Sequence, residues 1–229
     1  MQVQKLEGYI QDYTKFLQRT RHYDGIYIWE SLHHFQQNWD VEAPDFGKMY
    51  EKSLQNSTTK RLWKRENYNP KQMMLQFASQ QSDFVRQMFR NLLNEEKDIE
   101  NRIARFKFCC DELLREYKER HPISVENNHY HEDNHMIFLY LAFRWPEVYT
   151  FYSFPHFRQT LHLMGTRNLP GPHDLLRFIK VSKTIYRFLA KEEALFEQLH
   201  KHLPPNLRYL SQSMLVVQDF YRFVAGNVG

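Results

Sequence analysis

The chain has 229 residues, of which 42% are hydrophobic and 25% are charged. This balance is typical of a folded globular protein, and a chain of this length can bury a core without disulfides or a structural metal. It contains only seven glycines, which argues against sandwiches, barrels and phosphate loops that depend on glycine turns. The formal net charge of +4 is compatible with a nucleic-acid partner but is too small to establish one.

The two cysteines, Cys109 and Cys110, are adjacent in the sequence. A disulfide between neighbours is strained, and there is no third cysteine to pair with, so we expect two reduced thiols. The first residues lack the apolar run of a signal peptide. No apolar run reaches the roughly 18 residues that a membrane span needs. The sequence therefore predicts a soluble cytoplasmic protein without a membrane segment.

Apolar residues recur every three or four positions along most of the first half of the chain, which is the pattern of amphipathic helices. Residues 3–17 and 28–39 follow this pattern. Asp45 and the pair Asn69-Pro70 are start signals for further helices, because Asp and Asn cap exposed N–H groups and Pro suits the first turn. Further helices are predicted at about 45–54, from residue 70 onward, at 82–92, and at about 95–120.

The second half of the chain begins with the polar segment 121–132, which is rich in Asn and His and is the most loop-like stretch. Residues 136–143 are apolar nearly all round, which predicts a buried helix. Residues 148–154 are rich in Tyr, Phe and Thr and are the one place where a short strand is expected. Further helices are predicted from about residue 153 to a C-cap at Gly165, as two helices over 172–203, and at about 211–224.

These patterns together predict an all-α multi-helix bundle of about nine to eleven helices, with one short strand pair near residue 150 as the only β structure considered. No internal repeat, low-complexity tract or long linker interrupts the chain. We therefore predict a single helical domain over residues 1–229. The alternative is two subdomains with their boundary in the loop 121–132.

The segment 131–135 has the form H-E-x-x-H, in which two His residues one helical turn apart bind zinc and the Glu activates water. A zinc hydrolase that uses His131, Glu132 and His135 is therefore one hypothesis. Against it, the two intervening residues, Asp133 and Asn134, suit a helix cap better than a helix interior. We favour a helix start with incidental histidines and expect no bound metal. The candidate ligands for the alternative metal site are His129, His131 and His135.

A first group of cations surrounds two aromatic residues between positions 60 and 71. Cations beside flat aromatic rings suit a phosphate backbone and a stacked base. The competing interpretation is a solvated helix face with a buried Trp. The members of this 60–71 group are Lys60, Arg61, Trp63, Lys64, Arg65, Tyr68 and Lys71.

A second group of cations recurs at steps of three or four residues, which places it as one stripe on a helix. No acidic residue interrupts the run before Glu192, so pairing within the helix cannot neutralise it. The competing interpretation is an ordinary solvent-facing charged face. The members of this 177–191 stripe are Arg177, Lys180, Lys183, Arg187 and Lys191. Apolar residues expected to face the core on the other side are Leu176, Ile179, Ile185 and Leu189, or their near neighbours.

The sequence motifs of common enzymes are absent. No G-x-x-x-x-G-K-[ST] phosphate loop, no G-x-G-x-x-G turn and no G-x-S-x-G nucleophile motif occurs in the sequence. Cys109 and Cys110 lie on the apolar side of a predicted helix, where a thiol packs in the core rather than acting as a nucleophile. We therefore predict that the chain has no catalytic residues and no cofactor of its own.

Several stretches of the sequence resemble the N-terminal regions of McrB-like AAA+ GTPase subunits of modification-dependent (type IV) restriction systems. They span about residues 35–160. The stretches are 38–46 (NWDVEAPDF), 68–74 (YNPKQMM), 85–92 (VRQMFRNL), 128–130 (NHY) and 140–149 (YLAFRWPEVY).

This resemblance implies a non-catalytic region that recognises DNA, including modified DNA, for phage defence, and that works with an AAA+ motor module or a nuclease subunit. No nucleotide-binding motif is present, so GTP chemistry is not assigned to this chain. Phosphates would be held by the 177–191 stripe and the 60–71 group, with Trp63 or Tyr68 stacked on a base. The alternative from a different class is a helical protein–protein adaptor for AAA+ assembly or for docking a partner.

Overall fold

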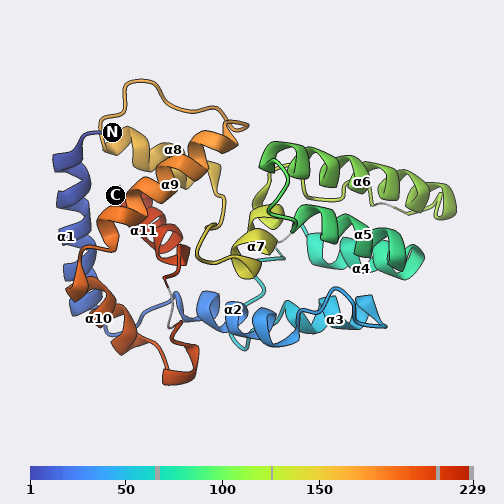
Figure 1. The fold of residues 1–229 in the computed structure, drawn as a ribbon, viewed down its shortest axis with the longest axis horizontal. Coiled ribbons are helices and arrows are strands. Elements are labelled where there is room, and N and C mark those ends of the chain that lie inside the picture. The colour runs from blue at the N-terminus through green and yellow to red at the C-terminus, as the bar shows by residue number, and fades with distance from the viewer. Residues whose placement is uncertain (65–67, 125, 210–211, 227–229) are drawn as a thin grey trace. The chain divides into compact units, whose positions relative to one another are not determined.

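The computed structural model describes residues 1–64, 68–124, 126–209 and 212–226. Within these ranges the chain forms eleven α-helices and one short 3-10 helix, Pro205–Leu207, and it contains no strand (Figure 1). This confirms the all-α fold and the number of helices predicted from the sequence. No helix in these ranges is both long enough and apolar enough to cross a membrane.

The helices fall into two compact units. The first unit combines residues 1–29 with residues 145–229, and the second contains residues 30–144. The division between residues 29 and 30 falls within helix α2, Ile26–Asn38. The loop 121–132 lies inside the second unit instead of marking a boundary, because its residues His129 and His131 are buried in that unit.

The first unit is built around α11, Leu215–Gly226, which contacts α1, α8 and α9. Every residue of α11 from Leu215 to Tyr221 is buried, as expected for a helix enclosed by others. Each surrounding helix therefore turns one face inward and leaves another face to solvent. The surrounding helices are α1 (Val3–Arg19), α8 (Phe154–Leu163), α9 (Leu175–Leu189) and α10 (Glu193–His202), the last of which packs on α1.

The second unit combines short helices with one long one, α6, Ile99–Arg120. Helix α6 packs against α4 and α5, and both of these contact α3. Every residue from Met136 to Phe143 in α7 is buried, which confirms the buried helix predicted there. The other helices of this unit are α3 (Phe46–Ser53), α4 (Pro70–Gln80), α5 (Ser82–Leu92) and α7 (His135–Arg144).

Aromatic rings fill much of the core of the second unit, which accounts for part of the high aromatic content of the chain. The Phe89 ring lies with its centroid 5.0–5.6 Å from the rings of four other residues. These distances are within the range in which aromatic pairs add to the free energy gained by burial alone. The four partners are Trp39, Phe46, Phe106 and Tyr140.

Side-chain caps fix the helix starts that were predicted from the sequence. Asp45 accepts a hydrogen bond from the Lys48 backbone N–H at 3.0 Å, and Asn69 accepts one from Gln72 at 3.2 Å. Each such cap is worth about 1 kcal/mol. Gly165 follows the end of α8 with a φ of +70°, a conformation that glycine adopts without strain. The capping signals at Asp45, Asn69 and Gly165 are thus confirmed.

The predicted short strand near residue 150 is wrong, because residues 148–153 form no strand in the structure. Their β-branched and aromatic side chains are buried against helices instead of against a second strand. Thr150, Phe151 and Tyr152 are buried, and the Tyr152 ring packs edge-on at 4.8 Å from Phe178 of α9. Strand propensity describes side chains that suit a half-buried surface, and here helices supply that surface.

Candidate functional site

Helix α9 packs into the first unit with one continuous face. Its buried residues recur at helical spacing, and the helix begins after Asp174. Leu176, which was predicted to face the core, is 49% exposed, so that part of the prediction is wrong. Ile185 and Leu189 are buried as predicted, whereas Ile179 is half-buried and the near neighbours Leu175 and Phe178 are buried instead of Leu176 and Ile179. Ser182 completes the buried face.

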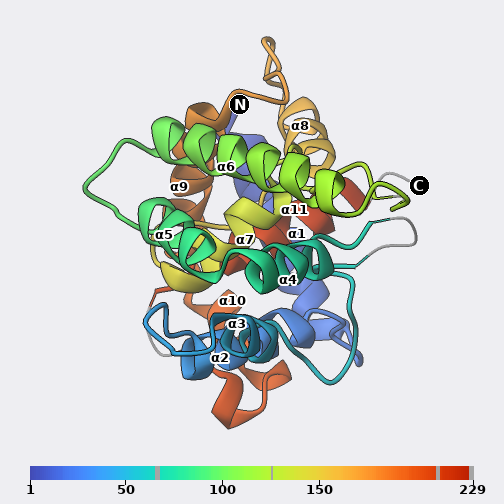
Figure 2. The same cartoon turned by 90° about the vertical axis from the view of Figure 1, so that its right-hand side faces the viewer.

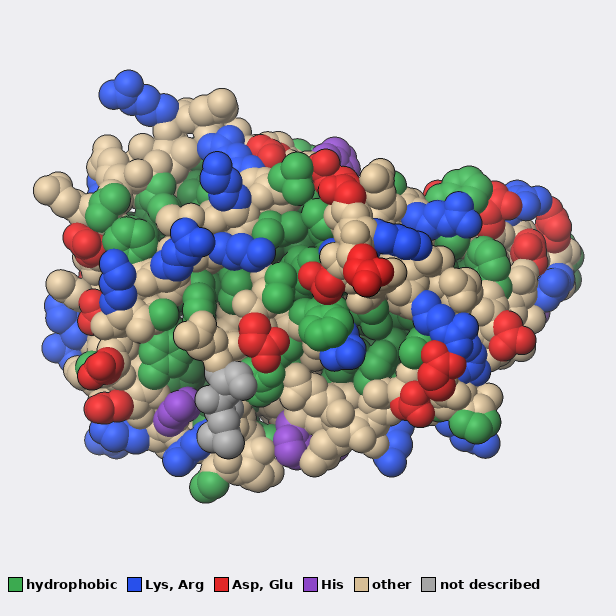
Figure 3. All heavy atoms as spheres, in the orientation of Figure 1, with side chains coloured by type: hydrophobic (Ala, Val, Ile, Leu, Met, Phe, Trp, Pro, Cys, Tyr) green, Lys and Arg blue, Asp and Glu red, His purple; other side chains and the backbone are tan. Residues whose placement is uncertain are grey.

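The 177–191 stripe lies on the opposite face of α9. Lys180, Lys183 and Arg187 are exposed, and within the described residues none of them forms an ion pair. Successive positions at 180, 183 and 187 stay within one side of a helix with 3.6 residues per turn. Figure 3 shows Lys and Arg side chains gathered over the part of the surface formed by α9. The structure therefore keeps these three cations together and open to solvent.

The two ends of the stripe differ from its centre. Arg177 is half-buried, donates to the Asn168 carbonyl oxygen and lies 3.8 Å from the Asp174 carboxylate. Lys191 follows the end of the helix, and its ammonium group lies 5.2 Å from the centroid of the Phe188 ring. Both residues are therefore partly engaged within the protein. The free cations of the stripe are Lys180, Lys183 and Arg187.

The 60–71 group does not form a comparable surface. Lys60, Arg61 and Lys64 are exposed, but Trp63 is only 4% exposed and offers no open ring face to a base. The prediction that Trp63 stacks on a base therefore lacks the exposed ring face that stacking requires. Arg65 lies outside the described residues.

The other two members of the 60–71 group are engaged in holding the fold together. The Lys71 ammonium group donates to the carbonyl oxygens of Glu51 and Leu54, at 3.1 and 2.8 Å, and lies over the Trp63 ring. Burial lowers the pKa of Lys71. The Tyr68 hydroxyl lies 2.9 Å from the Tyr130 carbonyl oxygen. The Lys71 side chain thus binds carbonyl oxygens at the end of α3, and the Tyr68 side chain binds one in the loop before α7.

The H-E-x-x-H segment does not lie on a helix. Helix α7 begins only at His135, and Tyr130 and Asn134 have φ values of +62° and +65°, which interrupt any helix before it. The His135 Nε2 atom lies 2.9 Å from the Leu62 carbonyl oxygen, while His131 is buried elsewhere. The zinc-hydrolase arrangement of His131, Glu132 and His135 is therefore not formed.

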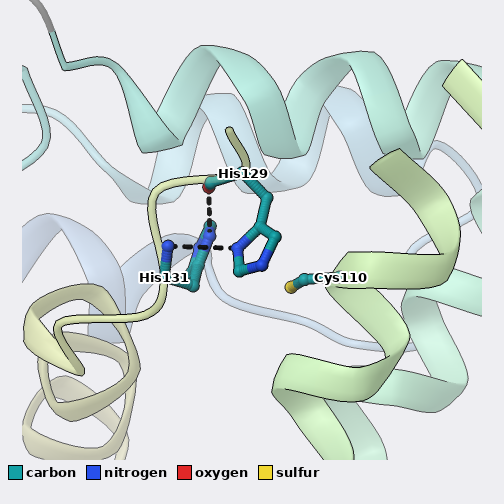
Figure 4. A group of neighbouring side chains, drawn as sticks. All are labelled: Cys110, His129 and His131. Atoms are coloured by element: carbon teal, nitrogen blue, oxygen red, sulfur yellow. Dashed lines mark hydrogen bonds between the residues drawn. The ribbon is translucent and has the colours of Figure 1, made fainter. Parts of the chain in front are cut away.

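A different cluster forms around two of these histidines. Cys110 of α6, His129 and His131 are all buried, and one potential ligand atom of each lies within 4.8 Å of the other two (Figure 4). Sequence reasoning placed Cys110 in the core but did not connect it with the histidines, because the contact joins two distant segments. Burial raises the pKa of the Cys110 thiol and lowers the pKa of His131 to about 3.

Hydrogen bonds determine which atoms of this cluster carry protons. The backbone N–H of His131 donates to His129 Nδ1 at 3.1 Å, so the His129 proton is on Nε2, which lies 3.0 Å from the Asp111 carboxylate. His131 Nδ1 donates to the His129 carbonyl oxygen at 2.6 Å. The Tyr140 hydroxyl lies 3.2 Å from His131 Nε2, which accepts from it.

The positions of these protons decide how well the cluster can bind a metal ion. A metal ligand must present an unprotonated nitrogen, but His129 Nε2 is the protonated one, and His131 Nε2 already accepts a hydrogen bond. A metal at this position would have to replace the hydrogen bonds to both rings. We therefore interpret Cys110, His129 and His131 as a polar element of the core.

No protein-family model, curated protein or solved structure matches the chain in the comparisons made. The fold and the surface therefore define only a class, which is an all-α protein with an exposed cationic helix face. The resemblance to McrB-like N-terminal regions remains a prediction from the sequence.

Proposed function

We propose that this chain binds nucleic acid through α9 and serves as the non-catalytic recognition region of a McrB-like restriction system. One observation carries the proposal: Lys180, Lys183 and Arg187 are exposed on one helix face and have no ion pair within the described residues. From residue 180 to residue 187 the helix rises about 10 Å. DNA presents one phosphate about every 3.4 Å of axis on each strand, so the rise from residue 180 to residue 187 corresponds to about three phosphate steps.

The contrast with other cations in the chain supports this proposal. Arg90, Arg115 and Arg222 all form ion pairs with nearby carboxylates. Such pairing reduces the charge that a surface presents to a phosphate backbone. Unpaired cations on a rigid helix keep their full charge and release counterions from DNA when they bind.

The second candidate function is a helical adaptor that binds a protein partner. The observation that favours it is Leu176, which is 49% exposed and lies one helical turn before Lys180 on the same side of α9. A phosphate backbone gains nothing from this side chain, whereas a protein partner would bury it and gain about 1–2 kcal/mol. Binding that tolerates high salt but is lost in Leu176→Ser would favour the adaptor.

The experiment that tests the proposal is fluorescence anisotropy with a short labelled duplex, plain or carrying modified cytosine, at 50 and 200 mM salt. Three contacts correspond to a salt slope of about 2.7, or roughly 40-fold weaker binding over this range. The variant Lys180→Glu/Lys183→Glu/Arg187→Glu should lose most of the binding and most of this slope.

The matched control is Lys5→Glu/Lys52→Glu/Lys201→Glu, which changes the net charge equally at exposed lysines of α1, α3 and α10. It should retain most of the affinity, because dispersed charges contribute only the general attraction of the protein to DNA. The proposal is wrong if the wild-type protein binds neither duplex at 50 mM salt. It is equally wrong if the two triple variants weaken binding to the same extent.

A further inference from the structure

A cavity of about 370 Å³ lies in the second unit, where α5 ends and α6 begins. The loop that joins these two helices, residues 93–98, is at the left edge of Figure 2. The cavity is lined by Asn91 at the end of α5, Lys97 in the loop, and Asn101, Arg102 and Arg105 in the first two turns of α6.

The side chains around this cavity share one chemical character. Three of the five are cations, the other two are amides, and no carboxylate is among the lining residues. Guanidinium and ammonium groups can only donate hydrogen bonds, and each amide offers an NH₂ group. A concave site with so many donors suits a ligand rich in acceptor oxygens that carries negative charge.

Internal contacts hold part of this lining in place. The Arg102 side chain is only 3% exposed, and its guanidinium donates to the Leu92 carbonyl oxygen at 2.9 Å and to Glu95 at 2.5 Å. The Lys97 ammonium group lies 3.0 Å from the Asn91 amide oxygen. A buried arginine that is fixed by two partners forms a rigid wall, and a rigid wall reduces the entropy lost on binding.

Arg105 is a lining cation that no nearby carboxylate neutralises. It is exposed, and within the described ranges it forms no ion pair and no side-chain hydrogen bond. Glu95 neutralises Arg102, so the charges of Lys97 and Arg105 remain for a ligand. Two uncompensated positive charges match the charge of a phosphate group, which is between −1 and −2 at neutral pH.

The N-terminus of α6 contributes little to this site by itself. The Asp98 side chain accepts the Asn101 backbone N–H at 3.0 Å and thereby occupies one of the donors that could hold an anion there. The donors available to an anion here are therefore mainly the side chains that line the cavity.

We propose that this cavity binds a phosphate group, with its oxygens accepting hydrogen bonds from Lys97, Arg105 and the amides of Asn91 and Asn101. The phosphate belongs either to a small phosphorylated molecule or to a nucleic-acid backbone, and the recognising chemistry is the same for both. The site lies in the second unit and shares no residue with α9, so it does not depend on the function proposed for α9.

The test is isothermal titration calorimetry of the whole chain with inorganic phosphate, at constant ionic strength maintained with chloride. The wild-type protein should bind one phosphate saturably. Arg105→Gln and Lys97→Gln should each weaken this binding about tenfold, the effect of losing one charge-assisted hydrogen bond. The matched control is Arg120→Gln, the same change on an exposed arginine at the far end of α6, and it should bind phosphate as tightly as the wild-type protein.

The proposal is overturned if no saturable heat is seen, or if Arg105→Gln and Arg120→Gln bind phosphate equally well. Titrations with a nucleoside monophosphate and with a duplex then identify the source of the phosphate. If Arg105→Gln weakens binding of the monophosphate only, the site binds a small ligand. If it weakens binding of the duplex, the site binds the nucleic-acid backbone. The triple variant of α9 should retain phosphate binding, so failure of one proposal is distinguishable from failure of the other.

Discussion

The 60–71 group and the 177–191 stripe have similar compositions in the sequence but have become different kinds of structure. In the stripe, a regular helix separates the buried side chains from the cations, and Lys180, Lys183 and Arg187 remain exposed and unpaired within the described residues. In the 60–71 group, Trp63 is buried and Lys71 is bound to two carbonyl oxygens. Clustered cations therefore form one exposed patch only where the backbone places them all on one side of an element.

The 60–71 group is held by a second segment of the same unit. The Leu62 carbonyl oxygen lies 2.9 Å from His135 Nε2, and the Tyr68 hydroxyl lies close to Tyr130 and Asp133. These contacts link the group to the loop that carries His131. Substitutions of Trp63, Tyr68 and Lys71 should therefore change stability, and substitutions in the stripe should change binding.

The largest expected effect on stability comes from Trp63. Trp63→Ala removes a side chain that is 4% exposed and should lower the free energy of unfolding by about 3–5 kcal/mol, because it leaves a cavity in the core. Urea unfolding followed by circular dichroism measures this change. The control Lys183→Ala, at an exposed position of α9, should change stability by less than about 0.5 kcal/mol. Equal effects of the two substitutions would contradict the comparison.

The pH dependence of stability tests the loop to which the 60–71 group is linked. Burial lowers the pKa of His131 to about 3, whereas an unfolded His titrates near its usual value of 6.5. Above pH 6.5 both states are neutral at this residue, and as the pH falls toward 3 only the unfolded state gains a proton. Stability should therefore fall over this range by several kcal/mol at most.

The measurement is the free energy of unfolding between pH 7.5 and 4, with His131→Gln as the comparison. A Gln side chain has no titrating proton, so this variant should be less stable than the wild-type protein at pH 7 but should lose less stability on acidification. Parallel pH curves for the two proteins would show that His131 does not contribute to the loss.

An effect of intermediate size is expected when the exposed cations of the two segments are reversed in charge. The α9 variant Lys180→Glu/Lys183→Glu/Arg187→Glu should lose about 2 kcal/mol or more of duplex binding at 50 mM salt, together with most of the salt slope. Lys60→Glu/Arg61→Glu/Lys64→Glu changes the net charge equally and should lose much less. If the second variant loses as much binding as the first, the 60–71 group is also part of the nucleic-acid surface.

How much of this could be predicted from the sequence depends on the range of the interactions involved. Helix positions, the caps at Asp45 and Asn69 and the exposure of Lys180 and Lys183 follow from local periodicity, and local rules predicted them. The division into two units joins residues 1–29 with residues 145–229, and no local pattern encodes such a pairing.

The buried histidine cluster escaped prediction for the same physical reason. His129 and His131 lie in a polar loop, and only contacts with α6 and α7, through Cys110 and Tyr140, make this loop part of the core. The lining of the cavity between α5 and α6 was missed because Asn91, Lys97 and Arg105 show no common periodicity. Their proximity depends on the turn between α5 and α6, which brings the two helices together.

The smallest expected effect concerns Lys71, and it tests most directly whether a cation of the 60–71 group is structural. Lys71→Met keeps an apolar side chain against Trp63 but removes the hydrogen bonds to Glu51 and Leu54. Water can reach part of this site, so the loss should be about 1 kcal/mol rather than the full cost of a buried unpaired group. Duplex binding should change little beyond the effect of one distant charge. The control Lys64→Met, at an exposed residue, should leave stability unchanged within about 0.5 kcal/mol. A Lys71→Met protein with wild-type stability and strongly reduced duplex binding would reverse the assignment, because Lys71 would then be a phosphate contact rather than a cap on the end of α3.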